Sequence, residues 1–255
     1  MTDLKNKTIL VTGASKGIGR AIVERLGQSG AYVIAHYGSD RAGAEEATSD
    51  IPDERKLLVS ADLNDLDSVE ALWDEAERWR GKVDIFVNNA ATMMWNGGFD
   101  APLEDWDKVW RDTLNINVLG PVRLLRRAVR HYRETGGGVI ITLSSWAAQR
   151  GVGNPDTIAY GASKAAVAAA TQSIARAYAK ENILAYIIAP GVVRTRLSED
   201  FARSQGGEEK VTQSLAMGEW VSPAELANLV NFLSTGEVRQ LSGATLDVNG
   251  ASYIR

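Results

Sequence analysis

Residues 8–19 read TILVTGASKGIG, and this stretch decides the fold. Its apolar start, Thr8–Thr12, is typical of a buried strand, and an amphipathic segment with helical spacing follows it. Between the two, Gly13 permits a tight turn, Gly17 lets the backbone approach a phosphate, and Gly19 lets helix and strand pack closely. Three glycines alone would equally suit a turn that needs positive φ. The strand and helix on either side favour a dinucleotide site, with the phosphates at the helix N-terminus.

Short apolar runs recur along the whole chain, and longer segments with helical spacing lie between them. Near-continuous apolar runs are typical of strands buried on both faces of a parallel sheet. The alternation therefore predicts an α/β fold: a doubly wound, mostly parallel, seven-stranded sheet flanked by helices, in one domain over residues 1–255. Ligands of such sheets bind at the carboxyl ends of the strands. The predicted strands are Thr8–Thr12, Tyr32–Ala35, Leu57–Val59, Val83–Val87, Val139–Leu143, Ile183–Ile188 and Thr245–Val248, and the predicted helices include Ala21–Gln28, Asp67–Trp79, Trp106–Arg133 and Ser163–Ala179.

The composition excludes several catalytic chemistries. The 255 residues include no cysteine and two histidines, His36 and His131. Without cysteine there is no disulfide, no thiolate nucleophile and no cysteine-ligated zinc. Neither histidine lies near a candidate nucleophile or ligand, which disfavours a Ser-His-Asp hydrolase and a histidine metal cluster, so no metal site is predicted. If the protein is an enzyme, its acid–base group is of another kind.

Charge and hydropathy limit the partners. The net charge is −4 and the pI is about 5.4, which argues against a non-specific nucleic-acid binder. No stretch approaches the ~18 uninterrupted apolar residues of a membrane span. The start, Met1–Leu10, lacks the apolar core of a signal peptide. We expect a cytoplasmic protein with no nucleic-acid or membrane partner.

The residues after the second predicted strand bear on the type of dinucleotide. NAD enzymes place an acidic residue there to bind the ribose 2′-hydroxyl, and that place falls at about Tyr37, which is no carboxylate. Lys16 in the glycine turn, with Ser39 and Arg41 after the strand, supplies a cation and donors that suit a 2′-phosphate. NADP is therefore predicted, with NAD as the alternative because Asp40 is close by. Solvated surface charges are the competing interpretation of these cations.

A tyrosine and a lysine provide the missing acid–base group. Tyr160 and Lys164 stand four residues apart at the start of an alanine-rich helix, which puts them on one face. A phenol has a pKa near ~10, and a lysine ammonium beside it lowers that value. The pair is then able to exchange a proton with an alcohol or a carbonyl. Such a spacing also arises by chance, so the motif needs support from its surroundings.

The strand Val139–Leu143 ends in two serines, at the edge where ligands bind. A hydroxyl at this place is suited to hold a substrate oxygen and to stabilise developing charge. Ser145 is the better candidate, and Ser144 is expected to line the end of the strand. Serines that merely cap a loop are the alternative.

Taken together, these motifs resemble the short-chain dehydrogenases/reductases, in the shorter, single-domain branch of that family. The resemblance runs from about Lys7 to the C-terminus and implies a Rossmann-type fold. Its motifs are specific in combination and occur in the family's order. They are Thr12-Gly13-x₃-Gly17-x-Gly19, Asp62 after the third strand, Asn88-Asn89-Ala90 after the fourth, Asn117, Ser145, Tyr160, Lys164, and Pro190-Gly191 with Val193 and Thr195.

The resemblance implies a role for each matching residue. Tyr160 is the acid or base, Lys164 lowers its pKa and binds the nicotinamide ribose, Ser145 orients the carbonyl, and Asn117 holds a water that relays protons. The expected catalytic set is thus Asn117, Ser145, Tyr160 and Lys164. The expected cofactor-binding set is Gly13, Ser15, Lys16, Gly17, Ile18, Gly19, Tyr37, Ser39, Arg41, Asp62, Leu63, Asn89, Ala90, Tyr160, Lys164, Pro190, Gly191, Val193 and Thr195.

The sequence departs from the family pattern at three places. Ala91 stands where Gly usually follows Asn-Asn-Ala, the interval from Ser145 to Tyr160 is a couple of residues longer than common, and Arg196 follows Thr195. None of these removes a catalytic group. They put a substrate assignment by analogy in doubt.

The leading functional hypothesis is an NADP-dependent reductase of a ketone or aldehyde, reversible as an alcohol dehydrogenase. A 3-oxoacyl-carrier-protein reductase is the first alternative, because Arg130 and Arg176 resemble the places where that enzyme docks its acidic carrier. The stretch with Arg123, Arg126 and Arg127 is otherwise a solvated face or a source of interhelical ion pairs. A non-catalytic NADP-binding sensor is the second alternative. Enoyl reductases of the superfamily space tyrosine and lysine further apart, and epimerases are longer, which disfavours both.

Two segments are expected to shape the substrate site. Residues 145–157 form a long loop, and residues 192–218 form a longer, polar one that we interpret as a substrate lid; the alternative is a surface excursion with some helix. Apolar side chains suited to a bulky carbonyl follow two of the strands; packing in loops or at a subunit contact is the alternative. They are Met93, Met94, Trp95 and Trp146. The resemblance also implies a homodimer or homotetramer built on the helices at 114–133 and 163–179.

Overall fold

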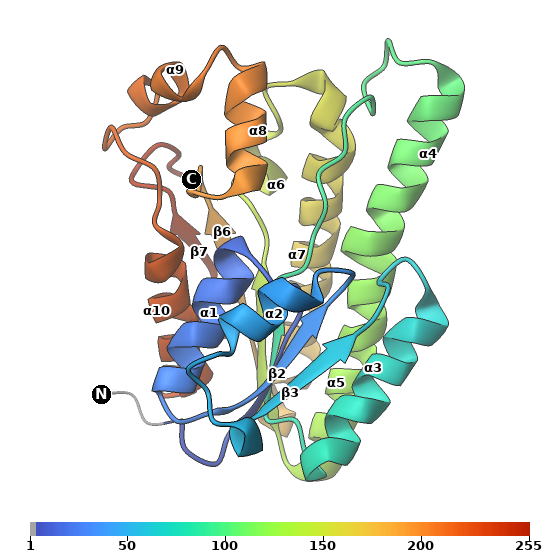
Figure 1. Cartoon of the computed structure of the whole chain (residues 1–255), viewed down its shortest axis with the longest axis vertical. Helices are drawn as coiled ribbons and strands as arrows, with labels where there is room; N and C mark the ends of the chain where they lie inside the picture. Colours follow the sequence, from blue (N-terminus) through green and yellow to red (C-terminus); the bar gives the residue numbers. More distant parts are fainter. Residues whose placement is uncertain (1–3) are drawn as a thin grey trace.

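The computed structural model describes residues 4–255. The first three residues of Met1–Leu10, the segment predicted to lack a signal peptide, lie outside the described residues. Seven strands form one parallel sheet in the order β3-β2-β1-β4-β5-β6-β7 (Figure 1). The predicted Rossmann-type, doubly wound sheet is confirmed. The strands are β1 Thr8–Val11, β2 Tyr32–Tyr37, β3 Lys56–Ser60, β4 Ile85–Asn88, β5 Gly138–Leu143, β6 Ile183–Pro190 and β7 Thr245–Val248.

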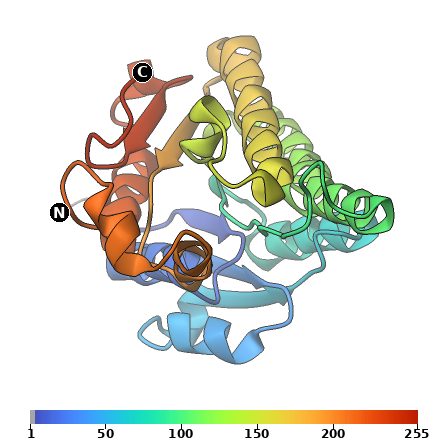
Figure 2. The same ribbon diagram turned by 90° about the horizontal axis from the view of Figure 1, so that it is seen from above.

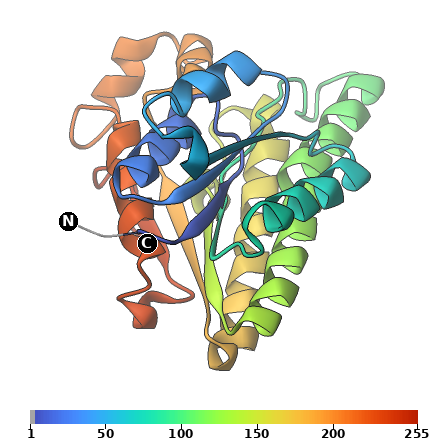
Figure 3. The ribbon, with the colours of Figure 1, turned by 60° about the horizontal axis from the view of Figure 1, so that its bottom comes forward.

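Helices cover both faces of this sheet, which explains the continuous apolar runs. On one face α1, α2 and α10 contribute to a large apolar cluster, and on the other α3, α5 and α7 contribute to a second. Figures 2 and 3 show the two layers on opposite sides of the sheet. All eight residues of β6 are buried between them. The helices are α1 Gly17–Gln28, α2 Arg41–Ala47, α3 Leu66–Arg80, α4 Leu103–Leu114, α5 Gly120–Thr135, α6 Ala147–Arg150, α7 Ile158–Tyr178, α8 Arg196–Ser204, α9 Glu208–Gln213 and α10 Pro223–Ser234.

The helix expected over residues 106–133 is interrupted. Between α4 and α5 the backbone forms a π-helical turn, Asn115–Leu119, in which the N–H of Gly120 donates to the carbonyl of Asn115. Pro121, at the start of α5, has no N–H to donate to the carbonyl of Asn117 four residues earlier. The proline thus favours the wider turn, and π-helical turns frequently occur at functional sites.

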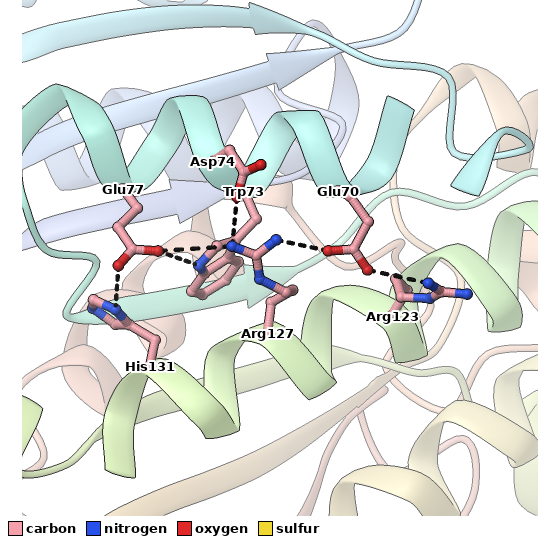
Figure 4. A network of polar contacts seen from close by, with 7 residues as sticks. All are labelled: Glu70, Trp73, Asp74, Glu77, Arg123, Arg127 and His131. Atoms are coloured by element: carbon pink, nitrogen blue, oxygen red, sulfur yellow. Dashed lines mark hydrogen bonds and ion pairs between the residues drawn. The ribbon is translucent and has the colours of Figure 1, made fainter. Parts of the chain in front are cut away.

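Two arginines of α5 form ion pairs with α3. Arg127 binds Glu70 and Asp74, each at 2.6 Å, and Arg123 binds Glu70 at 3.2 Å (Figure 4). The hydrogen bond from Arg127 is the main cause of a lowered pKa for the Glu70 carboxyl. These two members of the basic stretch are therefore interhelical ion-pair partners.

His131 lies buried at the end of the same α3–α5 contact. Its Nε2 accepts a hydrogen bond from the backbone N–H of Val83 at 3.1 Å, and its Nδ1 lies 3.2 Å from the carboxylate of Glu77. Because Nε2 is an acceptor, the ring proton is on Nδ1 and points to Glu77. The indole of Trp73 donates to the same carboxylate at 3.2 Å (Figure 4). The role of this histidine is structural.

The segment at 192–218 contains two helices, α8 and α9. Val192, Ala202, Val211, Leu215 and Trp220 form a small apolar cluster of their own, and Trp146 packs against it. Both helices lie above the sheet in Figure 1, at the end where the strands lead into the active-site loops. The loop at 145–157 likewise contains the short helix α6.

Among residues 4–255, no helix combines the length and the apolar character that crossing a membrane requires.

Candidate active site

The glycine turn connects β1 to α1 as its spacing predicts. Gly13 and Gly17 have φ values of +69° and +56°, a region that favours glycine. Gly19 has no room for a side chain, because a Cβ there would lie 2.0 Å from the carbonyl oxygen of Gly13. Backbone conformation therefore favours glycine at positions 13 and 17, and lack of space requires it at position 19.

His36 supports this turn, a role that the sequence did not reveal. It is buried on β2; its Nδ1 accepts a hydrogen bond from the N–H of Gly13 at 3.1 Å, and its Nε2 lies 3.1 Å from the carbonyl of Ala61. Burial lowers the pKa of the imidazole, which keeps it neutral and able to accept that hydrogen bond. The neutral ring thus connects the turn to the carboxyl end of β3. Only the strand pairing brings these three segments together.

Thr12 and Asn89 join β1 to the loop after β4. The Thr12 hydroxyl accepts hydrogen bonds from the backbone N–H groups of Asn89 and Ala90, at 3.0 and 3.1 Å. The Asn89 amide donates to the carbonyls of Thr12 and Gly13, at 2.8 and 3.2 Å. β1 and β4 are neighbours at the point where the strand order reverses, and ligands of open α/β sheets bind at that point.

A cavity of about 510 Å³ opens at this switch point. In the part of the chain that the structure describes, no side chain caps the start of α1, so its first N–H groups have no side-chain acceptor. A helix terminus suited to an anion, a turn with three glycines and a cavity of this size fit a dinucleotide. Of the predicted cofactor-binding residues, those that line the cavity are Gly13, Lys16, Gly17, Ile18, Gly19, Asn89, Ala90, Tyr160, Lys164, Pro190, Gly191, Val193 and Thr195.

The remaining predicted cofactor residues lie outside this cavity. Ser39 and Arg41 are exposed after β2, where Arg41 binds Glu45 at 2.8 Å. The carboxylate of Asp40 accepts a hydrogen bond from the N–H of Gly43 at 3.0 Å and so caps α2. Asp40 therefore has a local structural role. Ser15, Tyr37, Asp62 and Leu63 also line no part of the cavity, and of these only Asp62 is exposed.

Ser145 and Tyr160 lie where this cavity meets a second one. Both residues line both cavities, from the end of β5 and the first turn of α7. Burial raises the pKa of Tyr160, and a side-chain hydrogen bond with Ser145 opposes that shift. Ser144 instead donates to the backbone carbonyl of Lys164 at 3.0 Å. The structure thus brings Ser145 to the tyrosine and gives Ser144 a structural bond.

Lys164 lies buried one helical turn below Tyr160. Its Nζ donates to the carbonyl of Leu143 at 2.7 Å and lies 5.9 Å from the centre of the Tyr160 ring. Burial lowers the pKa of this amine to about 8. The pairing predicts a lowered pKa for Tyr160, whereas the structure raises it, because desolvation of the phenol dominates and the ammonium points to Leu143.

Asn117 holds the catalytic helix against the loop after β4. Its buried amide accepts from the N–H of Thr92 at 2.8 Å and donates to the Thr92 carbonyl at 2.8 Å and to Ser163 at 3.0 Å. The side chain thus forms hydrogen bonds both to the loop after β4 and to α7. Its backbone carbonyl lacks its ordinary helical donor, because Pro121 four residues later has no N–H.

The second cavity has a volume of about 460 Å³ and extends from Ser145 toward α8 and α9. Trp146 lines it, and Met93 lines both cavities. Trp95 lines the dinucleotide cavity, and Met94 lines neither. Two of the four predicted apolar side chains therefore face this space. A pocket of this size suits a small organic substrate.

Comparisons with known proteins agree with this geometry. A family profile described as Enoyl-(Acyl carrier protein) reductase matches residues 13–251. The chain is 34% identical over 251 residues to 3beta-hydroxysteroid dehydrogenase 1 of Eggerthella lenta, covering 97% of this chain and 94% of that protein. It is 30% identical over 250 residues to 3-oxoacyl-[acyl-carrier-protein] reductase FabG of Staphylococcus aureus, covering 97% and 98%.

Solved structures show the same likeness. The crystal structure of 3-ketoacyl-(acyl-carrier-protein) reductase from Brucella melitensis complexed with NADH has a TM-score of 0.85 and 30% identity, covering 99% of this chain and 100% of that one. Profile, relatives and fold agree over nearly the whole length. The chain therefore belongs to the short-chain dehydrogenase/reductase family, oxidoreductases that act on CH–OH and C=O groups with a nicotinamide cofactor.

Proposed function

We propose that this protein is an NADP-dependent reductase of a ketone or aldehyde, reversible as an alcohol dehydrogenase. The observation that carries the proposal is the position of Ser145 and Tyr160 at the junction of the two cavities. A carbonyl in one cavity then meets a dinucleotide in the other within reach of both hydroxyls. Lys164 supplies a buried amine on the same helix face.

Each member of the set has a task that its environment supports. A bound nicotinamide supplies hydride to the carbonyl carbon in reduction and accepts it in oxidation. Ser145 donates a hydrogen bond to the carbonyl oxygen, and Tyr160 gives that oxygen a proton. Lys164 binds the ribose and, through the backbone carbonyl of Asn117 and a water, helps return a proton to Tyr160.

Tyr160 is protonated at neutral pH, because a phenol has an ordinary pKa of about 10 and burial raises it further. This is the form that donates a proton in reduction. The test is Tyr160→Phe, assayed by loss of NADPH absorbance with a panel of carbonyls. We expect activity to fall by a factor of about 10² or more. Near-full activity in the variant would refute the assignment. Tight NADPH binding without turnover across the panel would favour a sensor instead.

Preference for NADP is supported by three residues, one in the glycine turn and two in the segment after β2. Lys16 lines the cavity, Ser39 and Arg41 lie after β2, and Asp40 is occupied as a helix cap. A cation and hydroxyl donors suit a 2′-phosphate. Arg41→Gln is expected to raise the Kd for NADPH about tenfold and to leave that for NADH unchanged, measured by calorimetry. Equal affinities of the parent for both would contradict the preference.

The arrangement also supports the wider expectations. The chain acts as one cofactor-binding domain, in the cytoplasm, with residues 192–218 as the substrate lid. Leu119 and Val122 are exposed at the junction of the π-helical turn with α5, which suits the homodimer or homotetramer expected from α5 and α7. Sedimentation that shows only monomer at micromolar concentration would exclude this assembly.

A 3-oxoacyl-carrier-protein reductase is the second candidate. Arg130 and Arg176 are both exposed, and within residues 4–255 neither has an ion-pair partner, unlike Arg123 and Arg127. Two free cations suit an acidic carrier. Charge reversal at both positions, assayed with carrier-bound and free substrates, should weaken only the carrier-bound reaction. An equal effect on both substrates would exclude carrier docking.

A further inference from the structure

The second cavity, from here on called the substrate-side cavity, is lined by two cationic side chains and by no carboxylate. Arg150 ends α6, and Lys210 lies in the middle of α9; both line the cavity next to Ser145 and Tyr160. None of the residues that line it is an aspartate or a glutamate. The two positive charges come from segments far apart in the sequence and face one space.

Neither cation is neutralised by the protein. Over residues 4–255, Arg150 and Lys210 have no ion pair, although acidic residues lie close to Lys210 in the sequence. Glu208 is bound instead by Arg194 at 2.8 Å, and Asp200 is paired within its own helix. An anion that enters this cavity therefore meets no competing carboxylate on its lining.

A ring contact positions one of the two side chains. The guanidinium of Arg150 lies over the ring of Trp146, 4.5 Å from its centre. A held side chain loses less entropy when it binds a ligand, so this contact favours binding by Arg150. Lys210 lies beside Gly206, where a Cβ would come 3.2 Å from the Lys210 Cδ.

Apolar side chains make up a further part of the lining. Leu197, Phe201, Val152 and Val192 are among them, beside several serines and a glutamine. The cavity thus combines the catalytic hydroxyls, apolar surface and two cations. A complementary ligand has a carbonyl group, an apolar body and an anionic group separate from the carbonyl.

We propose that the substrate is a ketone or aldehyde with a remote carboxylate or phosphate ester, and that Arg150 and Lys210 bind that anionic group. The proposal rests on the proposed function and specifies its substrate class. Charge-assisted hydrogen bonds to two cations fix the orientation of such a molecule and place its carbonyl at Ser145 and Tyr160. The anion contributes binding energy away from the reacting atoms, so its effect falls on KM.

The test compares substrates that differ only in charge. The carboxylate arm pairs 6-oxoheptanoate with 6-oxoheptanamide, and the phosphate arm pairs 6-oxoheptyl phosphate with the free alcohol, 7-hydroxyheptan-2-one. We expect kcat/KM to be about tenfold higher or more for the charged member of at least one arm, through KM. The double variant Arg150→Gln/Lys210→Gln should remove that preference and keep activity on the neutral member. Arg203→Gln, which removes a charge from α8 outside both cavities, should preserve it.

Equal kcat/KM within both pairs would overturn the proposal, as would a preference that survives in the double variant. If no carbonyl is turned over at all, the proposed reductase function fails, and the binding proposal is decided by calorimetry on the NADP-loaded protein. Tighter binding of 6-oxoheptanoate than of its amide, lost in the double variant, would uphold the anion site without the reductase. Equal binding would overturn the anion site as well.

Discussion

The buried amine of Lys164 should make protein stability depend on pH in a defined way, and its removal should abolish that dependence. Burial lowers the pKa of this group from 10.5 to about 8 in the folded protein. Each pKa unit corresponds to about 1.4 kcal/mol, so keeping Lys164 protonated costs the folded state about 3 kcal/mol. The other side chain of the pair, Tyr160, shifts the other way and titrates above its ordinary value.

The direction of the effect follows from where the protons are. Between about pH 8 and pH 10.5 the unfolded chain holds its lysine proton and the folded protein has released it. Stability therefore rises with pH in this window, and below pH 8 the full penalty is present. Relative to Lys164→Met, the parent should gain roughly 2 kcal/mol in free energy of unfolding between pH 7 and pH 10.

The assay is urea denaturation of parent and Lys164→Met across this pH range. The variant also loses the hydrogen bond to the Leu143 carbonyl, which adds an offset of about 1 kcal/mol that does not vary with pH. Lys180→Met, at an exposed position, serves as the control and should show a constant difference from the parent. A constant difference for Lys164→Met too would refute the reasoning.

Three further substitutions test the supports of the site. Gly19→Ala places a Cβ 2.0 Å from a backbone carbonyl oxygen of the glycine turn, so its affinity for NADPH, measured by calorimetry, should drop at least about tenfold. The control Gly153→Ala, in open space, should bind NADPH like the parent. Equal affinities of the two variants would be inconsistent with this reasoning. Asn117→Ala leaves the half-buried backbone groups of Thr92 unpaired and should lower the free energy of unfolding by about 2 kcal/mol in urea. No loss would mean that water replaces the amide. Arg127→Gln separates α5 from the Glu70 carboxylate and should cost about 1 kcal/mol, less at high salt; a loss that salt leaves unchanged would point to packing instead.

The strand layout was predictable from sequence because burial on both faces leaves a continuous apolar signature. All four residues of β1 and all eight of β6 are buried, so each appears as an uninterrupted run. The short helices α8 and α9 left no such signature. Their apolar cluster is assembled from side chains that are separated along the chain and meet only in the folded protein, so a polar segment was interpreted as loop.

The candidate site was predictable where chemistry requires one residue type at one spacing. Ser145 and Tyr160 lie at the cavity junction, and Lys164 lines the dinucleotide cavity beside them, as their positions after a strand and on one helix face indicate. The support from His36 was not predictable, since it depends on pairing between β2 and β3 and on the path of the glycine turn. The π-helical turn at Asn117 had one available signal, the proline at position 121, which the helical periodicity around it obscured.

The order in which the two groups proposed as catalytic titrate links the pH dependence of stability to that of activity. Lys164 has a pKa of about 8, and burial raises that of Tyr160 above its ordinary value. As pH rises, the lysine therefore loses its proton first, while the tyrosine is still an acid. If the ammonium is the active form, kcat/KM for NADPH, measured at a fixed carbonyl concentration well below its KM, should be constant below pH 8 and fall above it with a single ionisation.

This profile reports the free enzyme, so its midpoint should agree with the pKa at which the stability difference of Lys164→Met begins to change. Lys164→Arg is the informative variant, because its guanidinium keeps its charge through this range. In that variant the fall above pH 8 should disappear from whatever activity remains. A fall in kcat/KM that persists with arginine would assign the ionisation to another group. The role of the buried amine would then be structural, without a part in proton transfer.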